Sequence, residues 1–263
     1  KGQGVPQDYA TARLWFQKAA VQGNAEAQSI LGGLYDEGLG VTQDYVMARQ
    51  WWEQSATQGN ASAQVNLGVL YLNGQGVMQD DATARLWFEK AAAQGDAMAQ
   101  YNLGLLYTKG QGVPQDYAAA RQWLEKAVAQ GNAEAQSTLG VLYLNGQGVP
   151  QDDATAWLWF EKAAAQSYAM GQHNLGVLYT EGRGLPQDYA KARQLYEQAA
   201  AQGIAASQYN LGLLHYHGQS VSQDHVMAQQ WFQRASAQGN PDAQADIGML
   251  HFHGQGVPQD YVK

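Results

Sequence analysis

The chain has 263 residues, of which 45% are hydrophobic, 14% are charged and none is cysteine, and its formal net charge is −8. An acidic chain with few charges lacks the basic surface that nucleic-acid-binding proteins and polybasic membrane-surface proteins use. Without cysteine there is no disulfide, thiolate metal site or cysteine nucleophile, and no apolar run approaches the ~18 residues of a membrane-spanning helix.

An uninterrupted repeat of 36 residues organises the sequence. Columns of aspartate, glycine and glutamine keep this spacing, and the aspartates are Asp8, Asp44, Asp80, Asp116, Asp152, Asp188, Asp224 and Asp260. Each copy carries a glycine-rich stretch such as YLNGQGVPQDDATA at residues 143–156. A phosphate-binding loop is used once per site and has a lysine after its glycines. The repeated stretches, which lack that lysine, are therefore interpreted as bends between helices.

The first predicted element is a helix over residues 8–22, with the sequence DYATARLWFQKAAVQ. Asp8 is its expected N-cap, because a carboxylate there accepts hydrogen bonds from free N–H groups and favours the positive end of the helix dipole. Gly23 is expected to end it. The apolar spacing predicts a buried stripe of Ala12, Trp15, Phe16, Ala19 and Ala20.

The second predicted element is a helix over residues 24–37, with the sequence NAEAQSILGGLYDE. Asn24 is its expected N-cap, and Gly38 is expected to end it in the left-handed conformation that glycine adopts at low cost. The side chains expected on its buried face are Ala27, Leu31, Leu34 and Tyr35.

These two helices recur in every unit, and one pair cannot bury its apolar face alone. Recurrent alanines let helix backbones approach closely, and larger aromatic side chains fill the remaining space. The sequence therefore predicts an all-α, right-handed superhelical α/α solenoid of 36-residue helix-turn-helix repeats.

One motif carries a resemblance to a known family: AQ-x-x-LG-x-LY-x-x-G-x-GV-x-QD-x-x-x-A-x-x-W-F-x-x-A-A-x-x-G, as in residues 63–95. It resembles the Sel-1-like repeat (SLR), a relative of the tetratricopeptide (TPR) repeat. The resemblance implies a non-enzymatic adaptor that binds proteins. Members include bacterial secreted or periplasmic proteins that meet host or envelope partners, and subunits of eukaryotic membrane-protein degradation complexes. The LG-x-LY helix would correspond to helix A of a TPR, on the concave face, and the A-x-x-W-F helix to helix B, on the convex face.

The expected organisation is a single array over residues 1–263, with a lone helix B at 1–23 and a final helix A plus a stub of helix B at 240–263. Six A–B pairs lie between them, at 24–59, 60–95, 96–131, 132–167, 168–203 and 204–239. The chain opens on KGQGVP rather than on methionine and closes on QDYVK, which repeats its opening. We therefore expect a fragment of a longer protein.

An asparagine column on helix A is the first candidate binding site, and it comprises Asn66, Asn102, Asn174 and Asn210. By resemblance, it corresponds to the asparagine ladder that holds the backbone of an extended peptide in some TPR grooves. An asparagine side chain offers both a donor and an acceptor, as a peptide unit requires. The ladder is interrupted at Ile30, Thr138 and Asp246.

Neighbouring columns of helix A would add apolar and aromatic anchors, since aromatic side chains dominate binding hot spots. The candidates are Tyr101, His173, Tyr209, Tyr216, Phe252, Leu72 and Leu144. The alternative is that the asparagines bond to a neighbouring helix and the tyrosines only pack.

No residue pattern in the sequence predicts catalysis, a metal or a cofactor. There is no Ser–His–Asp arrangement, no H-E-x-x-H and no P-loop, and the repeated aspartates are too spread out to converge. The segments HYHG at 215–218 and HFHG at 251–254 suggest a metal site. However, residues two apart on a helix point to nearly opposite sides, so each histidine pair is not expected to chelate one ion.

The expected function is thus a scaffold that binds a protein or an extended peptide in the concave groove, as a bacterial adaptor or a host- or envelope-interaction factor. The alternative is a structural spacer or an array that self-associates end to end. We expect no nucleic-acid partner and no membrane insertion. A periplasmic or secreted bacterial location is favoured over the cytoplasm.

Overall fold

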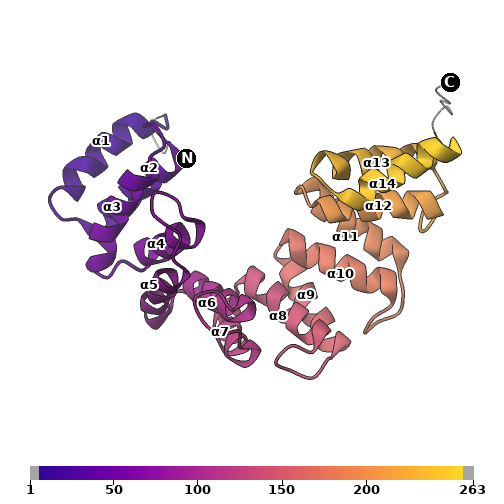
Figure 1. Cartoon of the computed structure of the whole chain (residues 1–263), viewed down its shortest axis with the longest axis horizontal. Helices are drawn as coiled ribbons and strands as arrows, with labels where there is room; N and C mark the ends of the chain where they lie inside the picture. Colours follow the sequence, from indigo (N-terminus) through magenta and orange to yellow (C-terminus); the bar gives the residue numbers. More distant parts are fainter. Residues whose placement is uncertain (1–5, 257–263) are drawn as a thin grey trace. The chain divides into compact units, whose positions relative to one another are not determined.

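The computed structural model describes residues 6–256, which form fourteen α-helices and no strand (Figure 1). Helices of type B are α1 (Tyr9–Ala20), α3 (Tyr45–Thr57), α5 (Asp81–Ala93), α7 (Tyr117–Ala129), α9 (Asp153–Ala165), α11 (Tyr189–Ala201) and α13 (His225–Ala237). Helices of type A are α2 (Ala25–Glu37), α4 (Ala61–Asn73), α6 (Ala97–Lys109), α8 (Ala133–Asn145), α10 (Ala169–Glu181), α12 (Ala205–His217) and α14 (Pro241–His253). The predicted all-α solenoid of 36-residue helix pairs is confirmed.

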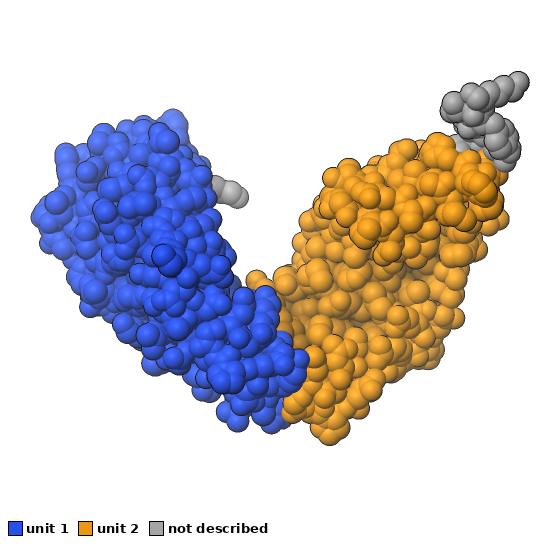
Figure 2. Space-filling view, in the orientation of Figure 1, with its two compact units in different colours: residues 1–132 blue, residues 133–263 orange. Residues whose placement is uncertain are grey.

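The chain divides into two compact units, residues 1–132 and residues 133–263, which Figure 2 colours blue and orange. The first unit contains α1 to α7 and the second contains α8 to α14. Within each unit, helices that follow one another in the chain pack side by side. The array thus buries its apolar faces between consecutive helices, as the repeat pattern predicts.

The helix ends follow the predicted capping pattern. Asp8 accepts hydrogen bonds from the backbone N of Thr11 at 3.0 Å and from its Oγ1 at 2.6 Å, and these bonds lower the pKa of the Asp8 carboxyl. Asn24 caps α2 by accepting from the backbone N of Ala27 at 2.8 Å. Gly38 ends α2 with φ = 70°, in the left-handed region.

Each helix A from α2 to α12 carries a glycine against which the next helix B packs a large buried side chain. A Cβ added at Gly68 would lie 2.7 Å from ring carbons Cδ1 and Cζ of Phe88, which is too close for atoms that are not bonded. The same pairing joins Gly32 to Trp52, Gly104 to Leu124, Gly140 to Phe160, Gly176 to Tyr196 and Gly212 to Phe232. The glycine column therefore sets how closely helices A and B approach.

Buried glutamines form a second structural column. Gln64, only 4% exposed, donates through Nε2 to the carbonyl of Ala56 at 3.1 Å and accepts from Gln94 Nε2 at 2.8 Å. The bond between glutamines thirty residues apart recurs as Gln28–Gln58, Gln100–Gln130, Gln136–Gln166, Gln172–Gln202 and Gln208–Gln238. Each of these glutamines thus links helix A to the end of the next helix B, and Gln28, Gln64 and Gln208 also bind a carbonyl of the preceding helix B.

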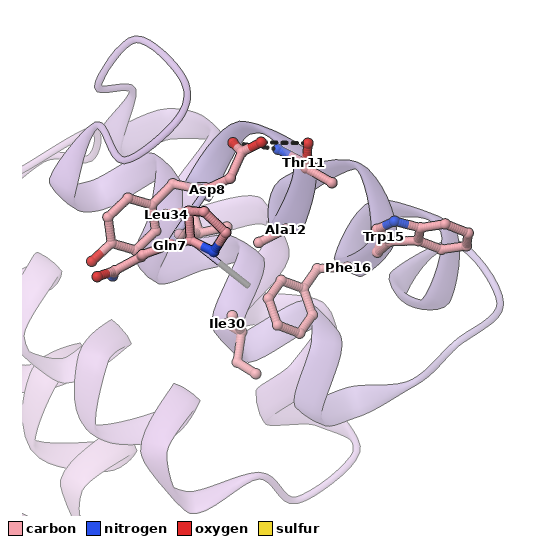
Figure 3. A pocket seen from close by; sticks show the side chains of 10 residues that line it. Gln7, Asp8, Thr11, Ala12, Trp15, Phe16, Ile30 and Leu34 are labelled. Carbon is pink, nitrogen blue, oxygen red and sulfur yellow. Dashed lines mark hydrogen bonds between the residues drawn. The ribbon is translucent and has the colours of Figure 1, made fainter. Parts of the chain in front are cut away.

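The predicted buried stripe of the first helix B is wrong at Trp15, whose side chain is 64% exposed. In Figure 3, Trp15 lies apart from Phe16 and Ile30, whose side chains point toward each other. The tryptophan column lies on the flank of helix B, where the stem of a lysine three residues later covers the indole. Lys18 Nζ lies 4.3 Å from the centroid of Trp15, and Lys90 Nζ lies 3.9 Å from that of Trp87.

Two helices of the second unit begin without a side-chain cap. Tyr168 precedes α10 and Ile204 precedes α12, and neither makes the capping hydrogen bond that asparagine or aspartate makes in other repeats. Ser167 adopts φ = 61° and Ser220 adopts φ = 64°, in the region that favours glycine. The missing caps and the left-handed serines are expected to lower the stability of the segments that contain them.

Candidate functional site

The four candidate asparagines lie half-buried on helices of type A, in two different settings. Asn174 Nδ2 donates to Ser137 Oγ at 3.3 Å, which links α10 to α8, and Asn210 hydrogen-bonds to Tyr196. The side chains of Asn66 and Asn102 make no hydrogen bond among residues 6–256. The first unit thus presents two asparagines whose amide groups are not engaged by the protein, while those of the second unit bind neighbouring side chains.

The apolar candidates also differ in exposure. Leu72 and Leu144 are half-buried and pack against core clusters of their units. Tyr101 is half-buried on α6. Phe252 is 74% exposed on α14, with its ring edge-on to His253 at a centroid distance of 5.0 Å. Phe252 therefore presents the largest free apolar surface among the candidates.

His173 belongs to the interior of the second unit. Its Nδ1 lies 2.8 Å from Ser207 Oγ, and its ring packs 5.9 Å from that of Tyr196. Burial lowers the pKa of His173 below its usual value, because the charged imidazolium is disfavoured away from water. The geometry assigns His173 to the packing between α10, α11 and α12.

The lowered pKa of His173 predicts that the second unit loses stability in acid. The unfolded histidine binds a proton near pH 6.5, whereas the folded one stays neutral to lower pH. The unfolded state therefore binds more protons, so stability is retained above about pH 6.5 and falls as the pH drops below it. Urea unfolding at several pH values measures this slope.

The matched variant is His173→Tyr, since tyrosine occupies the equivalent positions at Tyr101 and Tyr209. Its free energy of unfolding is expected to fall less between about pH 6.5 and pH 5 than that of the parent chain. The five other histidines are the same in both proteins, so the difference reports on His173. Equal slopes for the two proteins would contradict the assignment of the acid sensitivity to His173.

A pocket of about 300 Å³ lies between α12 and α14 in the second unit. It is lined by Tyr209, Leu213, Tyr216, His217, Asp246 and Met249. The Tyr209 hydroxyl donates to Asp246 Oδ2 at 3.1 Å, and the Tyr216 hydroxyl donates to Gln255 Oε1 at 3.2 Å. Desolvation and the hydrogen bond to Asp246 raise the pKa of Tyr209 to about 12. This pocket brings together two of the predicted aromatic anchors and the aspartate that interrupts the asparagine column.

A larger cavity, of about 440 Å³, lies beside α1 in the first unit (Figure 3). Phe16, Ile30 and Leu34 line its apolar part. Phe16 occupies the position at which the next helix B packs Trp52 on the glycine of α2, so the cavity lies where a helix of type A packs in the other pairs.

Neither a cluster of three or more metal-ligating side chains nor a membrane-spanning helix is found among the described residues. No group of three or more His, Asp or Glu side chains within residues 6–256 is placed to hold a metal ion. His251 Nε2 of the HFHG segment lies 3.2 Å from the side-chain amide of Gln229. Every helix from α1 to α14 has 12 or 13 residues, and none in this described range combines the length and the hydropathy needed to cross a membrane.

Sequence reasoning missed the role of the glutamine column and the pocket around Asp246. The glutamines were identified only as repeat markers, although a polar side chain that recurs once per unit within an apolar helix face indicates a buried hydrogen bond. Asp246 was identified only as an interruption of the asparagine column. The presence of a carboxylate at Asp246, one repeat after Tyr209 and Tyr216, was the feature of the sequence that could have indicated the pocket.

Comparisons with known proteins agree with this architecture. The model of the Sel1 repeat matches the chain eight times, over residues 1–24, 25–60, 61–96, 97–132, 133–168, 169–204, 205–240 and 241–263. No match was found among curated proteins. Among solved structures, the chain is similar to a protective antigen present in uropathogenic Escherichia coli strains that displays an SLR fold, with 38% identity and a TM-score of 0.78. That similarity covers 99% of this chain and 56% of the antigen.

Two further solved structures share the fold. A Sel1 repeat protein from Oxalobacter formigenes is 30% identical, with a TM-score of 0.78 over 87% of this chain and 97% of that one. An immunity protein from Pseudomonas aeruginosa is 18% identical, with a TM-score of 0.54 over 97% of this chain and 91% of that one, which shows the fold alone.

The Sel1 repeat forms a scaffold typical of protein–protein interaction, and proteins built from it are generally non-catalytic. The family model covers the whole chain, and the helix pairs, glycine column and capping aspartates recur in each described repeat. The chain belongs to the Sel1 repeat family.

Proposed function

We propose that this protein is a non-enzymatic scaffold that binds a protein or an extended peptide through the surface of its A helices. The observation that carries the proposal is the contrast between columns. The aspartate, glycine and glutamine columns are used in caps and packing, whereas Asn66 and Asn102 keep both amide groups free of partners among the described residues. Two such side chains, 36 residues apart, suit the alternating donors and acceptors of a peptide backbone.

We also propose that this protein is a bacterial adaptor that acts in the periplasm or outside the cell. Two solved structures with at least 30% identity to the chain come from bacteria, and one of them is a protective antigen present in uropathogenic Escherichia coli strains. A formal net charge of −8 is compatible with a protein partner and offers no support for a nucleic-acid partner.

Selection of a random-peptide phage library against the whole chain tests the binding surface. Peptides selected on the parent protein are expected to bind the double variant Asn66→Ala/Asn102→Ala roughly thirtyfold more weakly, since each of the two lost hydrogen bonds contributes about 1 kcal/mol. The control is Asn73→Ala/Asn145→Ala, which removes two exposed asparagines from the ends of α4 and α8. If both double variants bind the peptides as tightly as the parent, the asparagine surface is not the binding site.

End-to-end self-association is a second candidate, favoured by one pair of surfaces. An added Cβ at Gly248 of α14 meets no atom of the described residues within 4 Å, although the equivalent glycines from Gly32 to Gly212 face a side chain of the next helix B. The cavity beside α1 has the complementary apolar lining. Sedimentation over a range of concentrations distinguishes this candidate, because a mass that stays that of a monomer contradicts it.

A further inference from the structure

The pocket between α12 and α14 contains a carboxylate that no cation of the protein neutralises. Asp246 takes part in no ion pair within residues 6–256, and its one hydrogen bond is accepted by Oδ2 from the Tyr209 hydroxyl at 3.1 Å. Its other oxygen, Oδ1, has no partner among these residues. Asp242 lies one turn earlier on the same helix and adds a second negative charge. A half-buried, uncompensated carboxylate attracts a cationic group.

The walls of the pocket are aromatic and held in place. The hydroxyls of Tyr209 and Tyr216 are both tied to residues of the next repeat, Asp246 and Gln255. The Tyr209 ring packs at 5.6 Å from that of Phe232, which is fully buried, and the Tyr216 ring lies 5.0 Å from His225. Because both ends of these side chains are fixed, their rings form preorganised surfaces on which a planar cation can stack.

We propose that this pocket binds an arginine side chain of the partner protein, with the guanidinium stacked on the tyrosine rings and donating to Asp246 Oδ1. This deepens the proposed function and rests on it. The carboxylate excludes phosphate and acidic side chains by repulsion, and the apolar wall of Leu213 and Met249 suits the aliphatic part of arginine. Arginine is preferred to lysine because its guanidinium is planar, is more weakly hydrated and stacks on aromatic rings.

Methyl NMR of the whole chain labelled at methionine tests the proposal directly. The chain has six methionines, and only Met249 lines this pocket, so the signals of Met47, Met78, Met98, Met170 and Met227 serve as internal references. The probe is the blocked peptide Ala-Ala-Arg-Ala-Ala, and its control carries citrulline, which has the same shape without the charge.

We expect the arginine peptide to shift the Met249 signal in a saturable way, with a dissociation constant at least about fivefold lower than that of the citrulline peptide. The Asp246→Asn variant restores the residue found at four equivalent positions, Asn66, Asn102, Asn174 and Asn210. It is therefore expected to fold, and unchanged signals of the five reference methionines check this. In this variant the preference for the arginine peptide should fall sharply, to the part that stacking on the tyrosine rings contributes. Asp242→Asn, which removes a charge outside the pocket lining, should retain most of the difference.

Three results would overturn the assignment: equal binding of the arginine and citrulline peptides to the parent protein, an unaltered preference in Asp246→Asn, or no shift of Met249 with either peptide. Each of them leaves the proposed scaffold function standing, because that function is tested by Asn66 and Asn102 in the first unit. Conversely, the Asn66→Ala/Asn102→Ala variant could bind the selected peptides as tightly as the parent while the preference for the arginine peptide is retained. That result would place the binding surface in the second unit.

Discussion

Replacing Phe88 by alanine is expected to lower the free energy of unfolding by about 3–5 kcal/mol. Phe88 is fully buried in α5, and its ring fills the space between the glycine of α4 and the leucines of α6. Truncation removes the transfer energy of the ring and leaves a cavity that close-packed helices fill only in part. Urea unfolding followed by circular dichroism measures the loss. Leu86→Ala on the exposed side of the same helix is the control and should cost far less.

The glycine opposite Phe88 makes the experiment a double-mutant cycle. In the parent chain, Gly68→Ala places a methyl group against the Phe88 ring and is expected to cost about 1–3 kcal/mol. In the Phe88→Ala background the same methyl group enters the empty space, and alanine favours the helix over glycine by roughly 1 kcal/mol. Gly68→Ala should therefore destabilise the parent and stabilise the truncated variant. The same sign in both backgrounds would show that the two residues are not in contact.

The sequence was sufficient for features whose physical cause lies within a few residues. Asp8 and Asn24 were predicted as caps because a cap bonds to a backbone N–H three residues later, and both bonds are present. The left-handed Gly38 followed from the same local rule. Because the repeat multiplies each local signal, the period and the fold class were predictable as well.

Features that depend on distant partners were not predictable from one copy of the repeat. Trp15 was placed in the core because its spacing matches an apolar stripe, yet it is exposed because no helix pair precedes α1 among the described residues. The equivalent Trp51 and Trp87 are half-buried against the core of the preceding helix pair. Asn174 donates to Ser137, 37 residues earlier, whereas Asn66 makes no hydrogen bond among the described residues although Ser29 stands at the equivalent position. The sequence identifies such columns, but the packing between adjacent repeats, and not the residue type alone, decides whether a side chain finds a partner.

A buried glutamine from the same kind of column provides the second large effect. Gln64→Glu is expected to cost several kcal/mol at neutral pH, because it places a carboxylate at a position that is 4% exposed. The parent amide donates to the Ala56 carbonyl, and an ionised carboxylate cannot donate, so it meets that oxygen as a second acceptor. Unfolding by urea at neutral pH measures the loss. Gln50→Glu, on the exposed face of α3, adds the same charge and should be nearly neutral.

The pH dependence of Gln64→Glu identifies the cause. Burial raises the pKa of the new glutamate in the folded state above its unfolded value of about 4.3. As the pH falls, the folded state therefore takes up the proton at a higher pH than the unfolded state does. The loss is therefore full above the folded pKa and shrinks as the pH falls through it, because a protonated carboxyl donates to Ala56 again. Gln64→Leu removes the hydrogen bonds without adding a charge, and its smaller cost of about 1–3 kcal/mol should not change with pH. If Gln64→Glu lowers the free energy of unfolding equally in acid and at neutral pH, the cause is the shape of the new side chain. The lost donor and the buried charge would then not account for the effect.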